Sequence, residues 1–179
     1  RLQTPIFVML DLDIGMNEWL CAPLRWEDGR RLDRGKVLSA EELEAGRDFG
    51  RYLDVDGDGI PFRTYPGTHP TKGAFFTRGT SKNTRARYSE EGADYVENMQ
   101  RLLRKFETAR RLCPAPIRDD APEGSRIGVL YYGSSTPAMA EAMAALTLAG
   151  HPLDMMRLRA FPFHERVADF IDEHDFLFV

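Results

Sequence analysis

Hydrophobic residues in the last third of the chain gather into short, mainly apolar runs, and segments of helical length separate these runs. The runs span residues 127–132, 153–158 and 176–179, each of strand length. The segments between them, residues 137–150 and 162–174, carry apolar side chains at helical spacing. Strands that alternate with helices in this way predict right-handed βαβ units and a parallel sheet. The pattern therefore predicts an α/β fold.

A further apolar run lies near the start of the chain, at residues 5–10, and ends before Asp11. Its pattern is continuous rather than alternating, which predicts a buried strand of a parallel sheet. The acidic residues that follow would then lie at the carboxyl end of this strand, where ligands and partners bind in open α/β sheets.

The clearest helical pattern spans residues 89–112, with Ser89 as the candidate N-cap and the prolines of residues 113–116 as the stop. A second helix is predicted to start at Ser39, which can form a capping box with Glu42. Three later residues mark a rough apolar side of this second helix: Leu43, Phe49 and Leu53.

Residues 51–80 are rich in Gly, Pro, Asp and Thr, which favour turns. Aromatic residues are spaced through the segment and can anchor it on a core. The pattern therefore predicts a long ordered loop. Its cationic side chains could hold an anionic substrate: Arg63, His69, Lys72 and Arg78.

Arg63 lies between Pro61 and Pro66, which stiffen its loop. A fixed guanidinium suits bidentate capture of a carboxylate, and an internal ion pair with a nearby Asp is the alternative. Thr77 and Arg78 offer a hydroxyl and a guanidinium on flexible backbone, which fits either anion binding or a solvated turn.

Asp54, Asp56 and Asp58 precede a glycine and match the first half of an EF-hand loop. Carboxylates at alternate positions can converge on a hard cation. The twelfth position of the motif, where a bidentate Glu belongs, is Tyr65. The alternative is a turn whose carboxylates accept hydrogen bonds from backbone N–H groups.

Weaker signals come from one histidine, one glycine-serine turn and the cysteines. His69 can donate to a substrate or serve as a polar loop residue, and it lacks the neighbours of a metal site. Residues 133–135 precede a helix, a position that binds anions in many α/β proteins. Cys21 and Cys113 are expected to be reduced thiols rather than a disulfide.

Composition restricts the function classes. A net charge of −4 gives no electrostatic footprint for nucleic acid. No apolar run approaches the roughly 20 residues that a membrane span needs, and the start lacks a secretory signal peptide. We therefore expect a cytoplasmic protein that binds neither nucleic acid nor membrane.

Longer motifs resemble one family. Residues 11–17 (DLDIGMN), 33–38 (DRGKVL), 51–83 and 88–109 are similar to the α subunit of 2-oxoacid:ferredoxin oxidoreductases, most of all the 2-oxoglutarate type. Residues 127–163 are similar to the transketolase C-terminal-like domain of that subunit. The resemblance covers nearly the whole chain.

This resemblance implies an enzyme subunit. The family oxidatively decarboxylates a 2-oxoacid to acyl-coenzyme A with thiamine diphosphate, magnesium and iron–sulfur clusters, and passes electrons to ferredoxin. A β subunit supplies the diphosphate and magnesium site and the cluster. The motif of the pyrimidine-binding domain that contacts the cofactor is missing here, and so are cluster cysteines. We therefore expect a C-terminal piece that binds no cofactor by itself and is inactive alone.

On this mapping, residues 1–16 end the pyrimidine-binding domain, residues 17–125 are a connecting segment, and residues 126–179 begin the transketolase C-terminal-like domain. The resemblance implies no catalytic residue here. It makes Arg63 the first candidate ligand of the substrate carboxylate, with Thr77 and Arg78 as second choice.

Two other functions remain open. The chain could be a non-catalytic assembly module, for which exposed Trp19 and Trp26 would suit an interface. It could also be a cation-binding module through the three aspartates.

Overall fold

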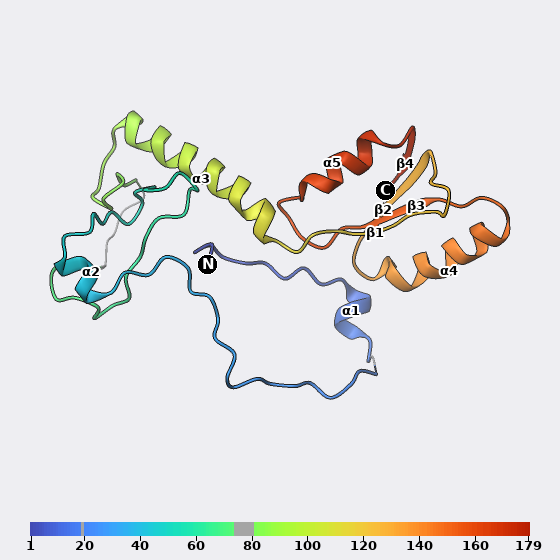
Figure 1. The fold of residues 1–179 in the computed structure, drawn as a ribbon, viewed down its shortest axis with the longest axis horizontal. Helices are drawn as coiled ribbons and strands as arrows, with labels where there is room; N and C mark the ends of the chain where they lie inside the picture. The colour runs from blue at the N-terminus through green and yellow to red at the C-terminus, as the bar shows by residue number, and fades with distance from the viewer. Residues whose placement is uncertain (19, 74–80) are drawn as a thin grey trace. The chain divides into compact units, whose positions relative to one another are not determined.

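The computed structural model describes residues 1–18, 20–73 and 81–179 (Figure 1). Within these ranges, every helix is either too short or too polar to cross a membrane. The chain divides into two compact units. The first unit comprises Arg1–Pro5 with Glu27–Ala109, and the second comprises Ile6–Trp26 with Arg110–Val179.

The second unit is built on a four-stranded sheet with the strand order β1-β3-β2-β4. Its strands are β1 (Ile117–Asp119), β2 (Ile127–Tyr131), β3 (Asp154–Arg157) and β4 (Phe176–Phe178). Strand β2 pairs in parallel with both β3 and β4, whereas β1 pairs antiparallel with β3. The predicted α/β fold and the parallel arrangement of its three strands are confirmed.

Helices α4 (Ser135–Leu148) and α5 (Glu165–Asp172) make the two crossovers, and Figure 1 shows them on opposite faces of the sheet. This follows from the strand order. The chain leaves β2 for one neighbour and then returns past β2 to the other, so crossovers of the same hand place the helices on opposite sides.

The core of this unit lies between the sheet and α5. It consists of Leu130, Met156, Val167 and Phe170, and the last two are on α5. Met156 and Phe170 are completely buried. The ring of Phe170 can lie directly on β2 because Gly128 has no side chain: a Cβ there would be 2.8 Å from Cε1 of Phe170.

Strand β1 lies where the sequence indicates only a linker. Three residues with one apolar side chain carry no periodic signal. A buried polar group holds the segment that follows: the Asp154 carboxylate accepts hydrogen bonds from the backbone N–H groups of Ala121 (2.8 Å) and Ser125 (3.1 Å). The same carboxylate lies 3.1 Å from Nε2 of His174, whose side chain is 1% exposed.

The prediction of a strand at residues 5–10 needs correction. These residues have no regular secondary structure, and the side chains of Ile6–Leu10 are 64–85% exposed. A strand requires a hydrogen-bonded neighbour, and none of the strands in the described ranges pairs with this segment. A short helix follows, α1 (Leu12–Met16), with Asp11 as its N-cap.

The first unit contains α2 (Ala40–Glu44), most of α3 (Gly92–Leu112) and long loops. The capping box of Ser39 and Glu42 at the start of α2 is confirmed. The helix is nevertheless shorter than the apolar pattern indicates, because Gly46 takes a left-handed conformation with φ +83° and the chain turns away. Phe49 and Leu53 therefore lie outside it.

Residues 51–73, the described part of the predicted loop, contain no helix and only one isolated strand-like bridge, from Arg63 to Val37. Gly59 brings this loop against α3. Its φ is +77°, and a Cβ there would lie 2.3 Å from the backbone nitrogen of Lys105. Only glycine permits so close an approach, and Arg101 and Thr108 of α3 then donate to the carbonyls of Gly59 and Asp58.

Candidate functional site

Arg63 is held by its backbone and by neutral side-chain contacts. Its N–H donates to the carbonyl of Lys36 (2.9 Å), and its carbonyl accepts from Leu38 (2.9 Å). Nη2 donates to the carbonyl of Arg34 (2.8 Å), and the guanidinium carbon lies 5.3 Å from the ring centre of Tyr65. Nε is buried and has no hydrogen-bond partner among the described residues.

Within the described chain, no carboxylate forms an ion pair with Arg63, so its charge is balanced by no acidic group of the loop. The guanidinium is therefore fixed in place and keeps donor capacity for an anion. Thr77 and Arg78, the second-choice residues, lie outside the described residues.

The three aspartates converge, with carboxylate oxygens within 4.8 Å of one another. The cation beside them belongs to the chain itself. Nζ of Lys36 donates to Asp56 (2.5 Å) and to Asp58 (2.7 Å), and also to the carbonyl of Ile60 (2.9 Å). Burial disfavours the charged form of Lys36, but these two bonds outweigh burial and raise its pKa.

The third carboxylate of this cluster has other partners. Asp54 accepts from the backbone N–H of Gly59 (3.0 Å) and pairs with Nε of Arg104 (2.9 Å). Asp58 likewise accepts from the N–H of Ile60 (2.7 Å). The acidic motif thus acts as a turn that caps backbone groups and surrounds an ammonium, and a metal ion would have to displace Lys36.

His69 and Lys72 both pair with Glu44 at the end of α2. Nζ of Lys72 lies 2.7 Å from one oxygen of Glu44, and Nε2 of His69 contacts the other. Lys72 first, and His69 second, lower the pKa of Glu44 to about 2. Nδ1 of His69 accepts from the backbone N–H groups of Thr71 (3.1 Å) and Lys72 (2.9 Å).

These contacts decide between the two interpretations of His69. Both of its ring nitrogens are used inside the unit, so it serves as a loop residue that ties residues 69–72 to α2. Glu44 could not be recognised as its partner from the sequence, because the two residues are 25 positions apart and only the fold brings them together.

The turn at residues 133–135 does precede a helix, as predicted, and a carboxylate of the same chain lies there. Asp11 accepts from the backbone N–H of Ser134 (3.1 Å) and also from that of Ile14 (2.8 Å). Ser134, followed by Ile14, lowers the pKa of Asp11. The carboxylate of Asp11 thus occupies the position at the start of α4 where an anion could bind.

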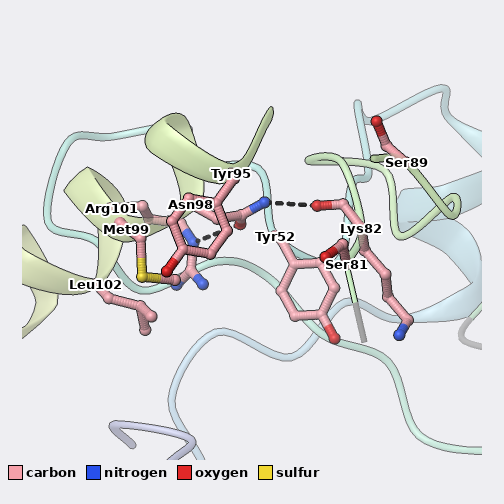
Figure 2. A pocket seen from close by; sticks show the side chains of 9 residues that line it. All are labelled: Tyr52, Ser81, Lys82, Ser89, Tyr95, Asn98, Met99, Arg101 and Leu102. Atoms are coloured by element: carbon pink, nitrogen blue, oxygen red, sulfur yellow. Dashed lines mark hydrogen bonds between the residues drawn. The ribbon is translucent and has the colours of Figure 1, made fainter. Parts of the chain in front are cut away.

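A cavity of about 230 Å³ opens in the first unit beside α3 (Figure 2). Its apolar wall consists of Tyr95, Met99 and Leu102 from α3, and Tyr52 lies on the other side. The remaining lining residues are polar or charged: Ser81, Lys82, Ser89, Asn98 and Arg101. Asn98 is fixed by a 2.7 Å bond to the carbonyl of Lys82.

The sequence pattern predicts only one side of this cavity. Tyr95, Met99 and Leu102 are apolar residues within the helical pattern of residues 89–112. Tyr52 and Arg101 carried no signal, because the fold alone brings them together.

Comparison with known proteins gives a likeness of fold. No family model matches the sequence, and no curated protein matches it. Among solved structures, a 2-oxoglutarate:ferredoxin oxidoreductase from Magnetococcus marinus with 2-oxoglutarate, coenzyme A and succinyl-CoA bound matches with a TM-score of 0.62 and 16% identity. The match covers 74% of this chain and 23% of that one. At this identity the likeness establishes a shared fold.

Proposed function

We propose that this chain is part of the α subunit of a thiamine-diphosphate-dependent 2-oxoacid:ferredoxin oxidoreductase, with 2-oxoglutarate as the 2-oxoacid. The observation that carries the proposal is the fold likeness to such an enzyme over 74% of the chain. The motifs of residues 51–83 and 88–109, which resemble the same family, support it independently of the fold.

In this proposal the complete enzyme decarboxylates its substrate oxidatively, transfers the acyl group to coenzyme A and passes the electrons to ferredoxin. The partner is a β subunit. Two cysteines, one of them exposed, cannot supply the four thiolates of an iron–sulfur cluster. In this proposal the partner supplies the cluster and the site for the diphosphate and magnesium, and this chain is inactive alone.

The role proposed for this chain is to hold the substrate. Arg63 has the properties of a carboxylate ligand: a backbone fixed on both sides, a guanidinium oriented by neutral groups, and a buried Nε without a partner in the described chain. Thr77 and Arg78 of the same loop are proposed as secondary contacts.

The test is Arg63→Ala in the complete complex. The loss of a charge-assisted hydrogen bond is expected to lower kcat/KM for 2-oxoglutarate by roughly 10- to 100-fold. Arg85→Ala is the matched control, because Arg85 is exposed and pairs with Asp48 (2.8 Å) in the same unit. Unchanged kinetic constants in Arg63→Ala would remove Arg63 from substrate binding.

The assembly-module alternative keeps one specific observation in its favour. Trp26 is 89% exposed, and the apolar residues Ile6–Leu10 are 64–85% exposed; Trp19 lies outside the described residues. If Trp26→Ala abolishes co-purification with the partner while Arg63→Ala leaves kcat/KM unchanged, the chain serves assembly alone.

A further inference from the structure

Two guanidinium groups in the first unit lie against one tyrosine ring. The guanidinium carbons of Arg51 and Arg101 are 5.5 Å and 5.6 Å from the ring centre of Tyr52. Lys105 follows Arg101 by one turn of α3, so its side chain leaves the same side of the helix. Two cationic side chains therefore lie against Tyr52, and a third, Lys105, lies on the same side of α3 as Arg101.

None of these three cations has a carboxylate partner in the described chain. Arg101 is 7% exposed and donates to neutral oxygens, the carbonyl of Gly59 (3.1 Å) and Oδ1 of Asn98 (3.5 Å). Lys105 donates to the carbonyl of Gln3 (3.4 Å). Arg51 is half-buried and makes no hydrogen bond to a described residue.

The acidic groups nearby do not compensate for this charge. Asp54 acts on Arg101 from a distance, but both of its oxygens are already bonded, to Gly59 and to Arg104. Residues 74–80, outside the described ranges, contain no Asp or Glu.

The electrostatics reflect this imbalance. Burial, and then the neighbouring cations, lower the pKa of Arg101 and that of Lys105. Burial first, and more weakly the charge of Arg63, lower the pKa of Arg51, against the opposing effect of Tyr52. Clustered, partly buried like charges are unfavourable unless an anion neutralises them.

We propose that Arg51, Arg101 and Lys105 bind the anionic group, a carboxylate or a phosphate, of a small organic ligand whose body occupies the neighbouring cavity. Arg101 and Tyr52 line that cavity and also belong to the cationic cluster, so they connect the two (Figure 2). Tyr95, Met99 and Leu102 give the ligand body an apolar wall. The site does not use Arg63, so it stands without the proposed function.

The test is thermal unfolding of the 179-residue chain in inorganic phosphate or in succinate, against sodium chloride of equal ionic strength. A bound anion should raise Tm by about 4 °C at ten times its dissociation constant, from mass action and the usual melting entropy of a chain this size. A rise in phosphate alone assigns a phosphoryl group, and a rise in succinate alone assigns a carboxylate. Equal melting in all three salts overturns the proposal.

Arg51→Gln separates a binding role from a structural one. It should abolish the rise in Tm and leave Tm in chloride unchanged or higher, because it removes one of the repelling charges. Arg85→Gln, which breaks an exposed ion pair with Asp48, is the control and should keep the full rise. A lower Tm of Arg51→Gln in chloride with a persisting rise in phosphate or succinate would contradict the proposal.

Discussion

The two units of this protein are stabilised in different ways. The second unit has a parallel sheet with an apolar cluster between it and α5, in which Met156 and Phe170 are completely buried. The first unit also buries apolar side chains, but its loops are joined by directed polar contacts, such as Lys36 among two aspartates and Arg101 on the carbonyl of Gly59. The stability of the second unit depends on the apolar area that it buries and on how well those side chains pack. The stability of the first unit depends on the positions of individual hydrogen-bonding atoms.

The largest loss of stability is expected from a substitution that creates a cavity in the core of the second unit. Phe170→Ala removes a fully buried ring and should lower the free energy of unfolding by about 3–5 kcal/mol. Urea denaturation measures this. Phe178→Ala is the control, because that side chain is 62% exposed and its loss should cost about 1 kcal/mol or less. Equal losses for the two variants would show that the core is not where the structure places it.

The first unit should be most sensitive where its loop meets α3. Gly59→Ala places a Cβ 2.3 Å from the backbone nitrogen of Lys105 and should cost at least about 2 kcal/mol. Gly57 has nearly the same φ, +78° against +77°, but nothing lies within 4 Å of its Cβ position. Gly57→Ala should therefore cost only about 1 kcal/mol, the left-handed backbone alone. If thermal unfolding gives the same Tm for the two variants, the close approach of the loop to α3 is refuted.

The smallest expected effect concerns Lys36. Lys36→Met leaves Asp56 and Asp58 without their ammonium and should cost about 1 kcal/mol, since half of the Asp56 side chain is exposed and solvent screens the pair. Calcium should stabilise this variant more than the wild type, because a cation then replaces the lost charge. Titration calorimetry with calcium checks the second expectation, and equal heats for both proteins would contradict it.

The same variant has a defined pH signature. Lys36 lowers the pKa of Asp56, so the pair stabilises the folded chain above the ordinary aspartate pKa of about 3.9. Its contribution is lost as pH falls through the lowered folded value. The difference in stability between wild type and Lys36→Met should therefore be constant near neutral pH and shrink below about pH 4.

The contrast between the units also explains what the sequence could and could not predict. Strands β2, β3 and β4 and helices α4 and α5 follow from hydrophobic periodicity, because burial in a layered sheet imposes that periodicity. The apolar run at residues 5–10 carries the same pattern and yet forms no strand. A hydrophobic pattern indicates which faces of a segment are apolar, whereas a strand also needs a neighbouring strand with which to form hydrogen bonds.

Helix α3 shows the same limit from another side. Its apolar stripe correctly predicts a helix, but Tyr95 and Leu103 of that stripe are 60% and 66% exposed, whereas Arg101 is buried. An arginine at a buried position has no periodic signal. Its place is fixed by the carbonyl of Gly59 and the ring of Tyr52, residues more than 40 positions away.

The candidate site divides in the same way. Arg63 could be singled out because two prolines flank it, and local stiffness can be read from neighbouring residues. Three other arrangements could not be predicted from the sequence, because each joins segments that only the folded chain brings together. They are the pairing of Glu44 with His69 and Lys72, the ammonium of Lys36 among aspartates, and the cationic cluster beside Tyr52.

The proposed function is tested most directly by activity of the complete enzyme. The full-length subunit that contains this chain would be tagged and purified with its partner, and reduction of ferredoxin would be followed with 2-oxoglutarate and coenzyme A. We expect reduction that requires both compounds and thiamine diphosphate, and that is slower with pyruvate. A purified complex that fails to reduce ferredoxin with every 2-oxoacid tested would contradict the proposal.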